Sequence, residues 1–334
     1  MPTPPRLPKL PSLSSALCLQ DSGWLDVGAG HRIAWSRHGT PDGMPAVVLH
    51  GGPGSGSSAR NLEFFDLARW QVVLFDQRGC GRSTPLGDIA HNTTADLVDD
   101  IEALRQHLGI ARWLVVGGSW GATLALTYAL RHGQHCLGLL LRGTFLGQQA
   151  DIDWFVDGAR AVRPAAYAAF AEGQAPHALI ERYAEAFRSG DAAKAHRALV
   201  RWLRWEAALE SPVEPPPDGP AVPAPGSPEA DRLLARGRIQ THYLRHRCFL
   251  KDSELIEGAR GLGHLPGVLL HGTHDLVCRP ANAEAVHAAW PGSVLHWVPG
   301  VGHAPFEPAM QSAMRQQLAH FLAHGRFAEQ EATP

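Results

Sequence analysis

The chain has 334 residues, of which 45% are hydrophobic, and a formal net charge of −2. This length suits one large α/β domain with an inserted subdomain, or two modest domains. The arginines form no dense basic run, so we expect neither nucleic acid nor an anionic membrane surface as a partner. No stretch approaches the ~20 consecutive apolar residues that a membrane-spanning helix needs.

Cysteine usage and the N-terminal composition predict a cytoplasmic protein. The five cysteines are scattered and lack the spacing of a metal or redox motif, so we expect reduced thiols and no bound metal. Residues 1–20 are rich in proline and serine and contain no apolar run typical of a signal peptide. We expect this segment to be a flexible arm, with ordered structure beginning near Gly23.

Short apolar strands then alternate with amphipathic helices, a pattern typical of a mostly parallel sheet in an α/β fold. The first element is expected to be a hairpin over 24–37 that turns at 28–30. The following strands and helices are predicted at 46–49, 71–75, 94–108, 113–116, 123–131 and 137–141.

The alternation stops near Gly147 and resumes after residue 250. The intervening residues are helical by pattern, and a Pro-rich insertion at 211–228 interrupts them. We therefore predict a helical cap inserted into the sheet domain, which continues with strands at 267–270 and 294–298 and a helix at 311–323. The predicted division is an arm (1–20), the first part of the core (21–147), the cap (148–250) and the second part of the core (251–334).

A candidate nucleophile lies between a predicted strand and a predicted helix. Residues 117–121 read Gly-Gly-Ser-Trp-Gly, which fits the G-x-S-x-G pattern of a sharp strand-to-helix turn that exposes its serine. The alternative is a glycine-rich turn with an incidental serine. The strand–turn–helix context favours Ser119 as a nucleophile.

A serine nucleophile needs a base and an acid that orients the base. Among 19 histidines, His303 follows the last predicted strand, and Asp275 follows the strand before it. The order Ser119, Asp275, His303 is that of an α/β-hydrolase triad. Alternatively, His303 is a structural loop residue and Asp275 caps a turn. His274 is a second candidate base, but it adjoins Asp275 and is poorly placed to reach a distant serine.

The oxyanion hole is expected from two backbone N–H groups. Residues 50–54, His-Gly-Gly-Pro-Gly, follow a buried strand, and this fold takes its second donor from the residue after the nucleophile. We assign the N–H groups of Gly52 and Trp120 to this role. The alternative is a Gly-Pro turn without a catalytic part.

Several of these motifs together resemble the proline iminopeptidases, a family of serine peptidases with the α/β-hydrolase fold. The resemblance covers about residues 21–325. It implies a cytoplasmic aminopeptidase that needs no cofactor, has a helical cap over its pocket, and releases N-terminal proline from short peptides. It rests on the motifs at 50–54, 76–83, 117–121, 141–143, 202–206, 239–243 and 302–303.

The resemblance also implies substrate-binding residues in the cap, where family members bind the substrate ammonium with two glutamates. One matches Glu206, whereas Gln240 stands where the family has the second acid, and Leu244 replaces an aromatic residue. Arg142 and Phe145 resemble family pocket positions. The alternatives are a surface Glu206 paired with a neighbouring arginine (Arg201 or Arg204), a salt-bridging Arg142 and a core Phe145.

Three other functions compete with the aminopeptidase hypothesis. An esterase or amidase acting on small uncharged acyl groups would share the triad, and Gln240 favours it. A non-catalytic binding protein would not need an intact set of three triad residues. Dehalogenases and epoxide hydrolases of this fold carry aspartate in place of Ser119. The sequence leaves the oligomeric state open.

Overall fold

The computed structural model describes residues 18–211, 213 and 220–329. Residues 1–17 of the expected arm, and residues 212 and 214–219 of the Pro-rich insertion, lie outside this part. The first strand begins at Leu19, four residues before the expected start of ordered structure.

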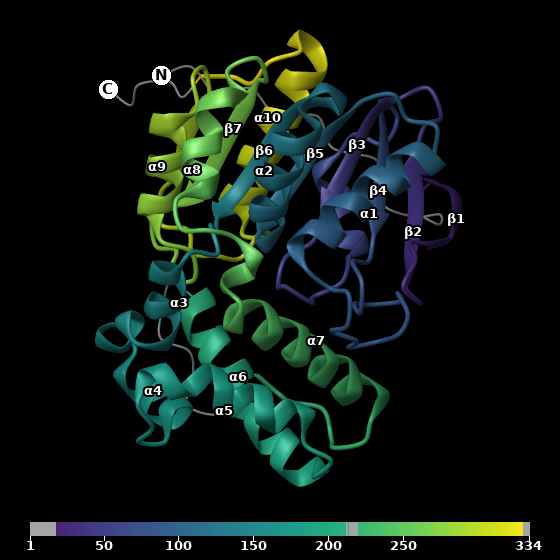
Figure 1. Ribbon diagram of the computed structural model, residues 1–334. Helices are drawn as coiled ribbons and strands as arrows, with labels where there is room; N and C mark the ends of the chain where they lie inside the picture. Colours follow the sequence, from purple (N-terminus) through teal and green to yellow (C-terminus); the bar gives the residue numbers. More distant parts are fainter. Residues whose placement is uncertain (1–17, 212, 214–219, 330–334) are drawn as a thin grey trace.

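A single mixed sheet organises the described core, with strand order β1-β2-β4-β3-β5-β6-β7-β8 (Figure 1). Strands β1 and β2 form an antiparallel hairpin, β2 pairs antiparallel with β4, and all later pairs are parallel. The predicted mostly parallel α/β sheet is therefore confirmed. The strands are β1 (Leu19–Asp26), β2 (Arg32–Gly39), β3 (Met44–Leu49), β4 (Trp70–Phe75), β5 (Trp113–Ser119), β6 (Cys136–Thr144), β7 (Gly267–Gly272) and β8 (Val294–Val298).

Both faces of the sheet are covered, which explains why a central strand such as β3 carries apolar side chains on both faces. In β3, Val47 and Leu49 enter one hydrophobic cluster, whereas Ala46 and Val48 enter the other. The first face carries α1 (Thr94–His107), α2 (Trp120–His132), α8 (Glu254–Ala259) and α9 (Pro280–Ala289). The second carries η2 (Ala59–Phe64) and α10 (Pro308–His324).

The described helices within residues 149–245 form a layer with a core of its own at one end of the sheet (Figure 1). Its helices are α3 (Gln149–Val156), η4 (Gly158–Ala161), α4 (Pro164–Ala171), α5 (Pro176–Arg188), α6 (Ala192–Glu210) and α7 (Pro228–Arg245). Packed aromatic rings fill this core: Phe155, Phe170, Tyr183, Phe187, Trp202 and Trp205. We call this layer the cap.

Some local expectations were wrong for identifiable reasons. Helix α2 begins at Trp120, directly after the exposed turn, rather than at Thr123. Pro228, taken as part of the insertion, is the first residue of α7, where its missing N–H costs nothing. The short helices α8 and α9 were not predicted. Three further 3₁₀ turns are η3 (Gly133–His135), η5 (Arg247–Phe249) and η6 (Arg260–Leu262).

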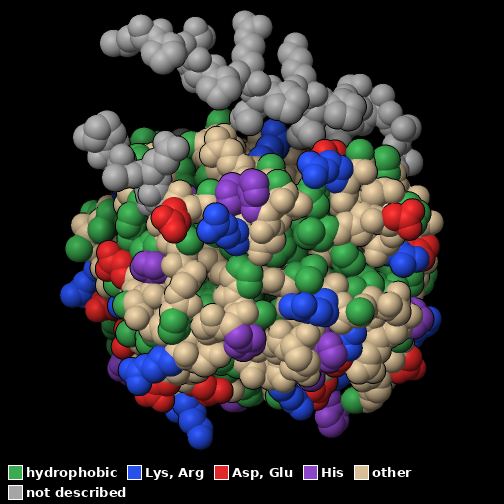
Figure 2. Space-filling model, turned by 90° about the horizontal axis from the view of Figure 1, so that it is seen from above, with side chains coloured by type: hydrophobic (Ala, Val, Ile, Leu, Met, Phe, Trp, Pro, Cys, Tyr) green, Lys and Arg blue, Asp and Glu red, His purple; other side chains and the backbone are tan. Residues whose placement is uncertain are grey.

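The surface carries charges of both signs. On the face away from the cap, lysine and arginine side chains are interspersed with acidic and hydrophobic ones (Figure 2). In the part of the chain that the structure describes, no helix is both long and apolar enough to cross a bilayer.

Candidate active site

The backbone at Ser119 is held in an unusual conformation at the junction of β5 and α2. Its φ and ψ angles are 58° and −124°, a strained region for a non-glycine residue. Close packing on both sides enforces the turn. A Cβ atom on Gly117 would lie 2.1 Å from the Gly121 carbonyl oxygen, and one on Gly121 would lie 2.1 Å from that of Leu49. The glycines of the G-x-S-x-G motif are therefore required by the turn itself.

Asp275 and His303 form a buried hydrogen-bonded pair between the loops after β7 and β8. The His303 Nδ1 atom lies 2.7 Å from Asp275 Oδ2, and Asp275 Oδ1 accepts hydrogen bonds of 2.9 Å from the N–H groups of Val277 and Cys278. Burial raises the pKa of Asp275, but the interactions with His303, His271 and the backbone outweigh burial and leave the pKa below its usual value. Asp275 is thus a carboxylate that fixes the imidazole and leaves Nε2 for other partners.

Cys278 lies next to both the serine and this pair. Its Sγ atom lies 3.8 Å from the Ser119 hydroxyl oxygen, and it belongs to a group with Asp275 and His303 whose polar atoms lie within 4.8 Å of one another. Burial raises the pKa of the Cys278 thiol well above its usual value, so the thiol is neutral at pH 7. Within the described residues, the Ser119 hydroxyl makes its polar contact with Cys278 and not with His303.

The other two histidines near Asp275 have different environments. His271 is fully buried; its Nδ1 accepts the Thr144 N–H at 3.3 Å, and its Nε2 donates to the Cys278 carbonyl oxygen at 3.0 Å. The two ring nitrogens of His271 therefore link the end of β6 to the Asp275 loop. His274, the second candidate base, is exposed and does not line the cavity that contains Ser119.

The proposed oxyanion loop packs directly against the serine turn. A Cβ atom on Gly51 would lie 3.3 Å from the Gly118 carbonyl oxygen and 3.5 Å from Ser119 Cβ. Gly52 lines the cavity, and Trp120 is buried at the start of α2. Their backbone N–H groups therefore come from the two segments that meet at Ser119.

Gln77 connects these two segments. Its side chain donates to the His50 carbonyl oxygen at 2.9 Å and accepts the Trp120 indole N–H at 2.9 Å. Its backbone N–H donates to His50 Nε2 at 3.0 Å. Burial lowers the pKa of His50, which keeps the imidazole neutral and able to accept this bond.

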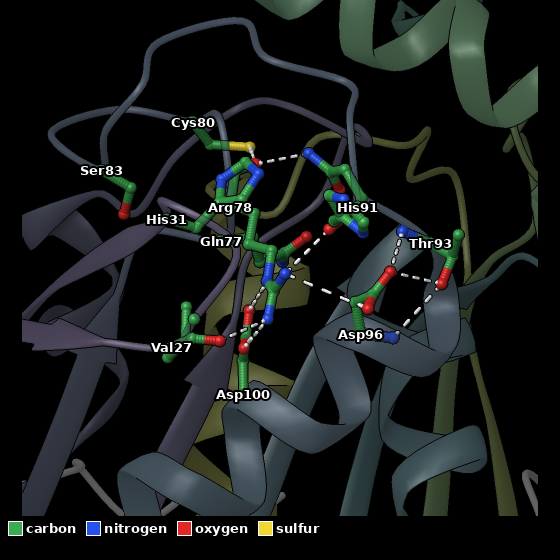
Figure 3. Close-up of polar contacts among 12 residues, drawn as sticks. Val27, His31, Gln77, Arg78, Cys80, Ser83, His91, Thr93, Asp96 and Asp100 are labelled. Carbon is green, nitrogen blue, oxygen red and sulfur yellow. Dashed lines mark hydrogen bonds and ion pairs between the residues drawn. The ribbon is translucent and has the colours of Figure 1, made fainter.

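The loop that carries Gln77 is anchored by Arg78, whose guanidinium lies between the first hairpin and α1 (Figure 3). It forms a two-bond ion pair with Asp100, at 2.6 and 2.8 Å, and donates to the carbonyl oxygens of Val27 and His91. Helix α1 is fixed next to this cluster by a capping box between Thr93 and Asp96. The sequence motif 76–83 thus has a structural role behind the site.

A cavity of about 220 Å³ lies between the carboxyl ends of the strands and the cap. Most of the predicted site residues line it, whereas Asp275 and Trp120 lie behind its wall. The lining includes Gly52, Ser119, Arg142, Phe145, Glu206, Gln240 and His303. The structure therefore brings together residues that are far apart in the sequence.

Glu206 points into this cavity and is paired with cap residues. Both of its carboxylate oxygens accept from Arg236 Nη2, at 3.0 and 2.9 Å, and one also accepts from Gln240 Nε2 at 2.7 Å. Gln240 in turn accepts the Trp202 indole N–H at 3.1 Å. The alternative of a surface glutamate paired with Arg201 or Arg204 was wrong, since Arg201 pairs with Glu172 instead.

Arg142 contacts the histidine loop. Its guanidinium donates to the His303 carbonyl oxygen at 2.5 Å and is 7% exposed. Burial lowers the pKa of Arg142, and the negative charge of Asp275 offsets part of this effect. Phe145, by contrast, is half-buried in the cavity wall.

Three charged residues of the cavity were not predicted from the sequence: Asp151, Glu210 and Arg236. Glu210 lies four positions after Glu206 on α6, so helical spacing could have placed both on one face. Arg236, the partner of Glu206 on α7, could not be placed by helical spacing, because the Pro-rich insertion separates the two helices in sequence.

Gly143 packs against the buried Asp275–His303 pair and provides a test of it. A Cβ atom there would lie 3.1 Å from both Asp275 Oδ2 and His303 Cε1, at a φ of +53°. We expect Gly143→Ala to lower kcat about 10-fold by displacing the imidazole, and to destabilise the fold by about 1–2 kcal/mol. Steady-state kinetics and urea unfolding measure the two effects.

The matched control is Gly109→Ala. Gly109 has a φ of +66°, a Cβ atom there would meet no neighbouring group within 4 Å, and the residue lies outside the cavity. This variant should lose similar stability and keep kcat within twofold. Equal kcat values for the two variants would contradict the packing argument.

Comparison with known proteins places this site in a family. Residues 45–309 match the α/β hydrolase fold family. A probable proline iminopeptidase of Leptolyngbya boryana is 39% identical over 318 residues, covering 93% of this chain and 97% of that protein. The proline iminopeptidase of Xylella fastidiosa strain Temecula1 is 40% identical, covering 86% and 92%.

The chain belongs to the proline iminopeptidase family. Among solved structures, the proline iminopeptidase of Mycobacterium smegmatis aligns with a TM-score of 0.59 at 22% identity, covering 91% of this chain and 98% of that one. At this identity the likeness concerns the fold alone. The resemblance to the proline iminopeptidase family and the α/β-hydrolase fold, both expected from the sequence motifs, are confirmed.

Proposed function

We propose that this protein is a serine aminopeptidase that releases N-terminal proline from short peptides through an acyl-enzyme. The observation that carries the proposal is the cavity itself, which has Ser119 and His303 on its core side and a cap carboxylate, Glu206, on the other. Such a pocket has room for one N-terminal residue beyond the serine. The cap closes the pocket past the terminal amine, which favours an exopeptidase.

In the proposed mechanism, the substrate ammonium is bound by the cap, and the scissile carbonyl lies beside Ser119. The serine side chain first rotates about its Cα–Cβ bond, away from Cys278 and toward His303 Nε2. Catalytic hydrogen bonds are often long in free enzymes and shorten when substrate binds. His303 then accepts the hydroxyl proton as the oxygen attacks the carbonyl carbon, and the N–H groups of Gly52 and Trp120 stabilise the oxyanion.

The tetrahedral intermediate collapses when His303 returns the proton to the leaving amine and the C–N bond breaks. Water then attacks the prolyl ester of Ser119, with His303 again as the base, and proline leaves. Asp275 keeps its charge and stabilises the imidazolium in both steps. Arg142 positions His303 through the backbone, and Phe145 lines the wall of the acyl pocket.

The test compares a proline arylamide with its N-acetylated form. We expect kcat/KM for the free amine to exceed that of the blocked substrate by at least 100-fold, because blocking removes the charge that the cap carboxylate binds and adds bulk at the closed end. The amount of coloured arylamine released at fixed times gives both rates. Equal rates with and without the free amine would contradict the aminopeptidase proposal.

The second candidate is an esterase or amidase for small uncharged acyl groups, and one observation favours it. The cavity presents the neutral amide of Gln240, and Glu206 is already paired with Arg236, so these residues together carry little net negative charge. A simple aryl ester hydrolysed faster than the prolyl ester would support this candidate. For location, the scattered free cysteines and the family resemblance support the cytoplasm.

A further inference from the structure

Three carboxylates line the cavity. Asp151 is paired with Arg279 and Glu206 with Arg236, whereas Glu210 has a different environment. Glu210 is the last residue of α6, and its side chain reaches the water of the cavity. Among the described residues, no arginine, lysine or histidine nitrogen lies within ion-pair distance of its carboxylate. Glu206, one turn earlier, has its charge matched by Arg236.

The position of Glu210 along the helix brings it close to the reacting groups. Its backbone carbonyl oxygen accepts the His303 N–H at 3.3 Å, which fixes the end of α6 against the histidine loop. Glu206 lies about 6 Å farther along the helix axis. In an N-terminal residue, the amine nitrogen is only about 2.5 Å from the scissile carbonyl carbon. The ammonium must therefore bind near Ser119 and His303, at the Glu210 end of the helix.

The electrostatic surroundings also favour a cation at this end. The C-terminus of the 19-residue helix α6 carries a partial negative charge from its unpaired carbonyl groups. The protein around the cavity desolvates Glu210 and raises its pKa, and the charge of Glu206 adds to that rise, whereas His303, Arg236 and Arg142 oppose it. A bound ammonium would compensate this unpaired negative charge.

We propose that Glu210 is the principal carboxylate that binds the substrate ammonium in this chain. The inference rests on the proposed aminopeptidase function and assigns a specificity role to a residue outside the family motifs. It also explains how the site functions with Gln240. The pair of Glu206 and Arg236 is neutral overall, and Glu210 supplies the net negative charge that Gln240 lacks.

The experiment measures kcat/KM for two aryl esters with rings of equal size, one prolyl and one cyclopentanecarbonyl. Only the first carries an ammonium. For Glu210→Gln we expect a 10- to 100-fold lower kcat/KM with the prolyl ester and a change within twofold with the carbocyclic ester. Glu185→Gln removes the same charge from an exposed position on α5, outside the cavity, and should leave both values unchanged.

Two further measurements separate the possible failures. The unfolding midpoint of Glu210→Gln and its rate of Ser119 labelling by a fluorophosphonate should match the wild type, which shows an intact fold and triad. A prolyl rate within threefold of the wild type, or an equal loss with both esters, would overturn the role of Glu210. A wild type that does not prefer the prolyl ester would instead contradict the proposed function.

Discussion

Replacing Ser119 by alanine is expected to lower kcat by about 10⁴- to 10⁶-fold, with little change in KM. The substitution removes the hydroxyl that the strained turn exposes beside the oxyanion loop. The proposed binding contacts in the cap and the proposed oxyanion N–H groups remain, so the residual rate should still exceed that of the uncatalysed reaction. Active-site labelling with a fluorophosphonate should disappear together with turnover.

Three additional variants make this expectation specific. His303→Ala should lose about as much activity as Ser119→Ala, and the double variant should lose little more, because residues that act as one unit are not additive. Ser189→Ala, at a half-buried position of the cap outside the cavity, should retain wild-type rates. A Ser119→Ala enzyme with more than a few per cent of wild-type kcat would exclude the acyl-enzyme mechanism.

Replacing Arg78 by methionine is expected to destabilise the protein by about 3–5 kcal/mol, because it leaves Asp100 as a buried carboxylate without a countercharge. Burial already raises the pKa of Asp100 to about 6 in the presence of Arg78. A raised pKa in the folded state means that stability falls as the pH rises above the unfolded value of about 4. The loss of stability caused by Arg78→Met should therefore be larger at pH 8 than at pH 5. Urea unfolding at both pH values measures it.

The matched control for Arg78→Met is Arg131→Met. Arg131 pairs with Asp99 at 3.1 Å on the surface, with both side chains more than half exposed, and such a pair contributes at most about 1 kcal/mol. Combining Arg78→Met with Asp100→Leu should recover much of the lost stability by removing the unpaired charge. Similar unfolding midpoints for Arg78→Met and Arg131→Met would show that the buried ion pair contributes no more to stability than the surface pair.

The serine turn and the loops of Asp275 and His303 could be predicted because their signals are local. A G-x-S-x-G turn needs its glycines for steric reasons that neighbouring residues impose. Loops after consecutive parallel strands necessarily meet at one edge of the sheet. These rules located Ser119, Asp275 and His303 from sequence alone.

The pairing of charges in the cavity could not be predicted, because it depends on how α6 and α7 pack across a long insertion. Glu206 pairs with Arg236 rather than with an arginine on its own helix. Arg142 proved to contact the backbone of the histidine loop, a role that its sequence position after a strand does not reveal. Short helices such as α8 have too few turns to show a clear apolar period.

The hydrogen bond between the His303 N–H and the carbonyl oxygen of Glu210 has a consequence for how peptides enter and leave. If the whole cap swung away from the core, this bond would break and the backbone beside the base would lose one of its two fixed contacts. The backbone at His303 would then be held by Arg142 alone, so the orientation of the proposed base would be less well fixed until the cap closed again. Closure of the cap over a peptide would then also orient His303. This coupling would limit the hydrolysis of substrates that are only partly bound.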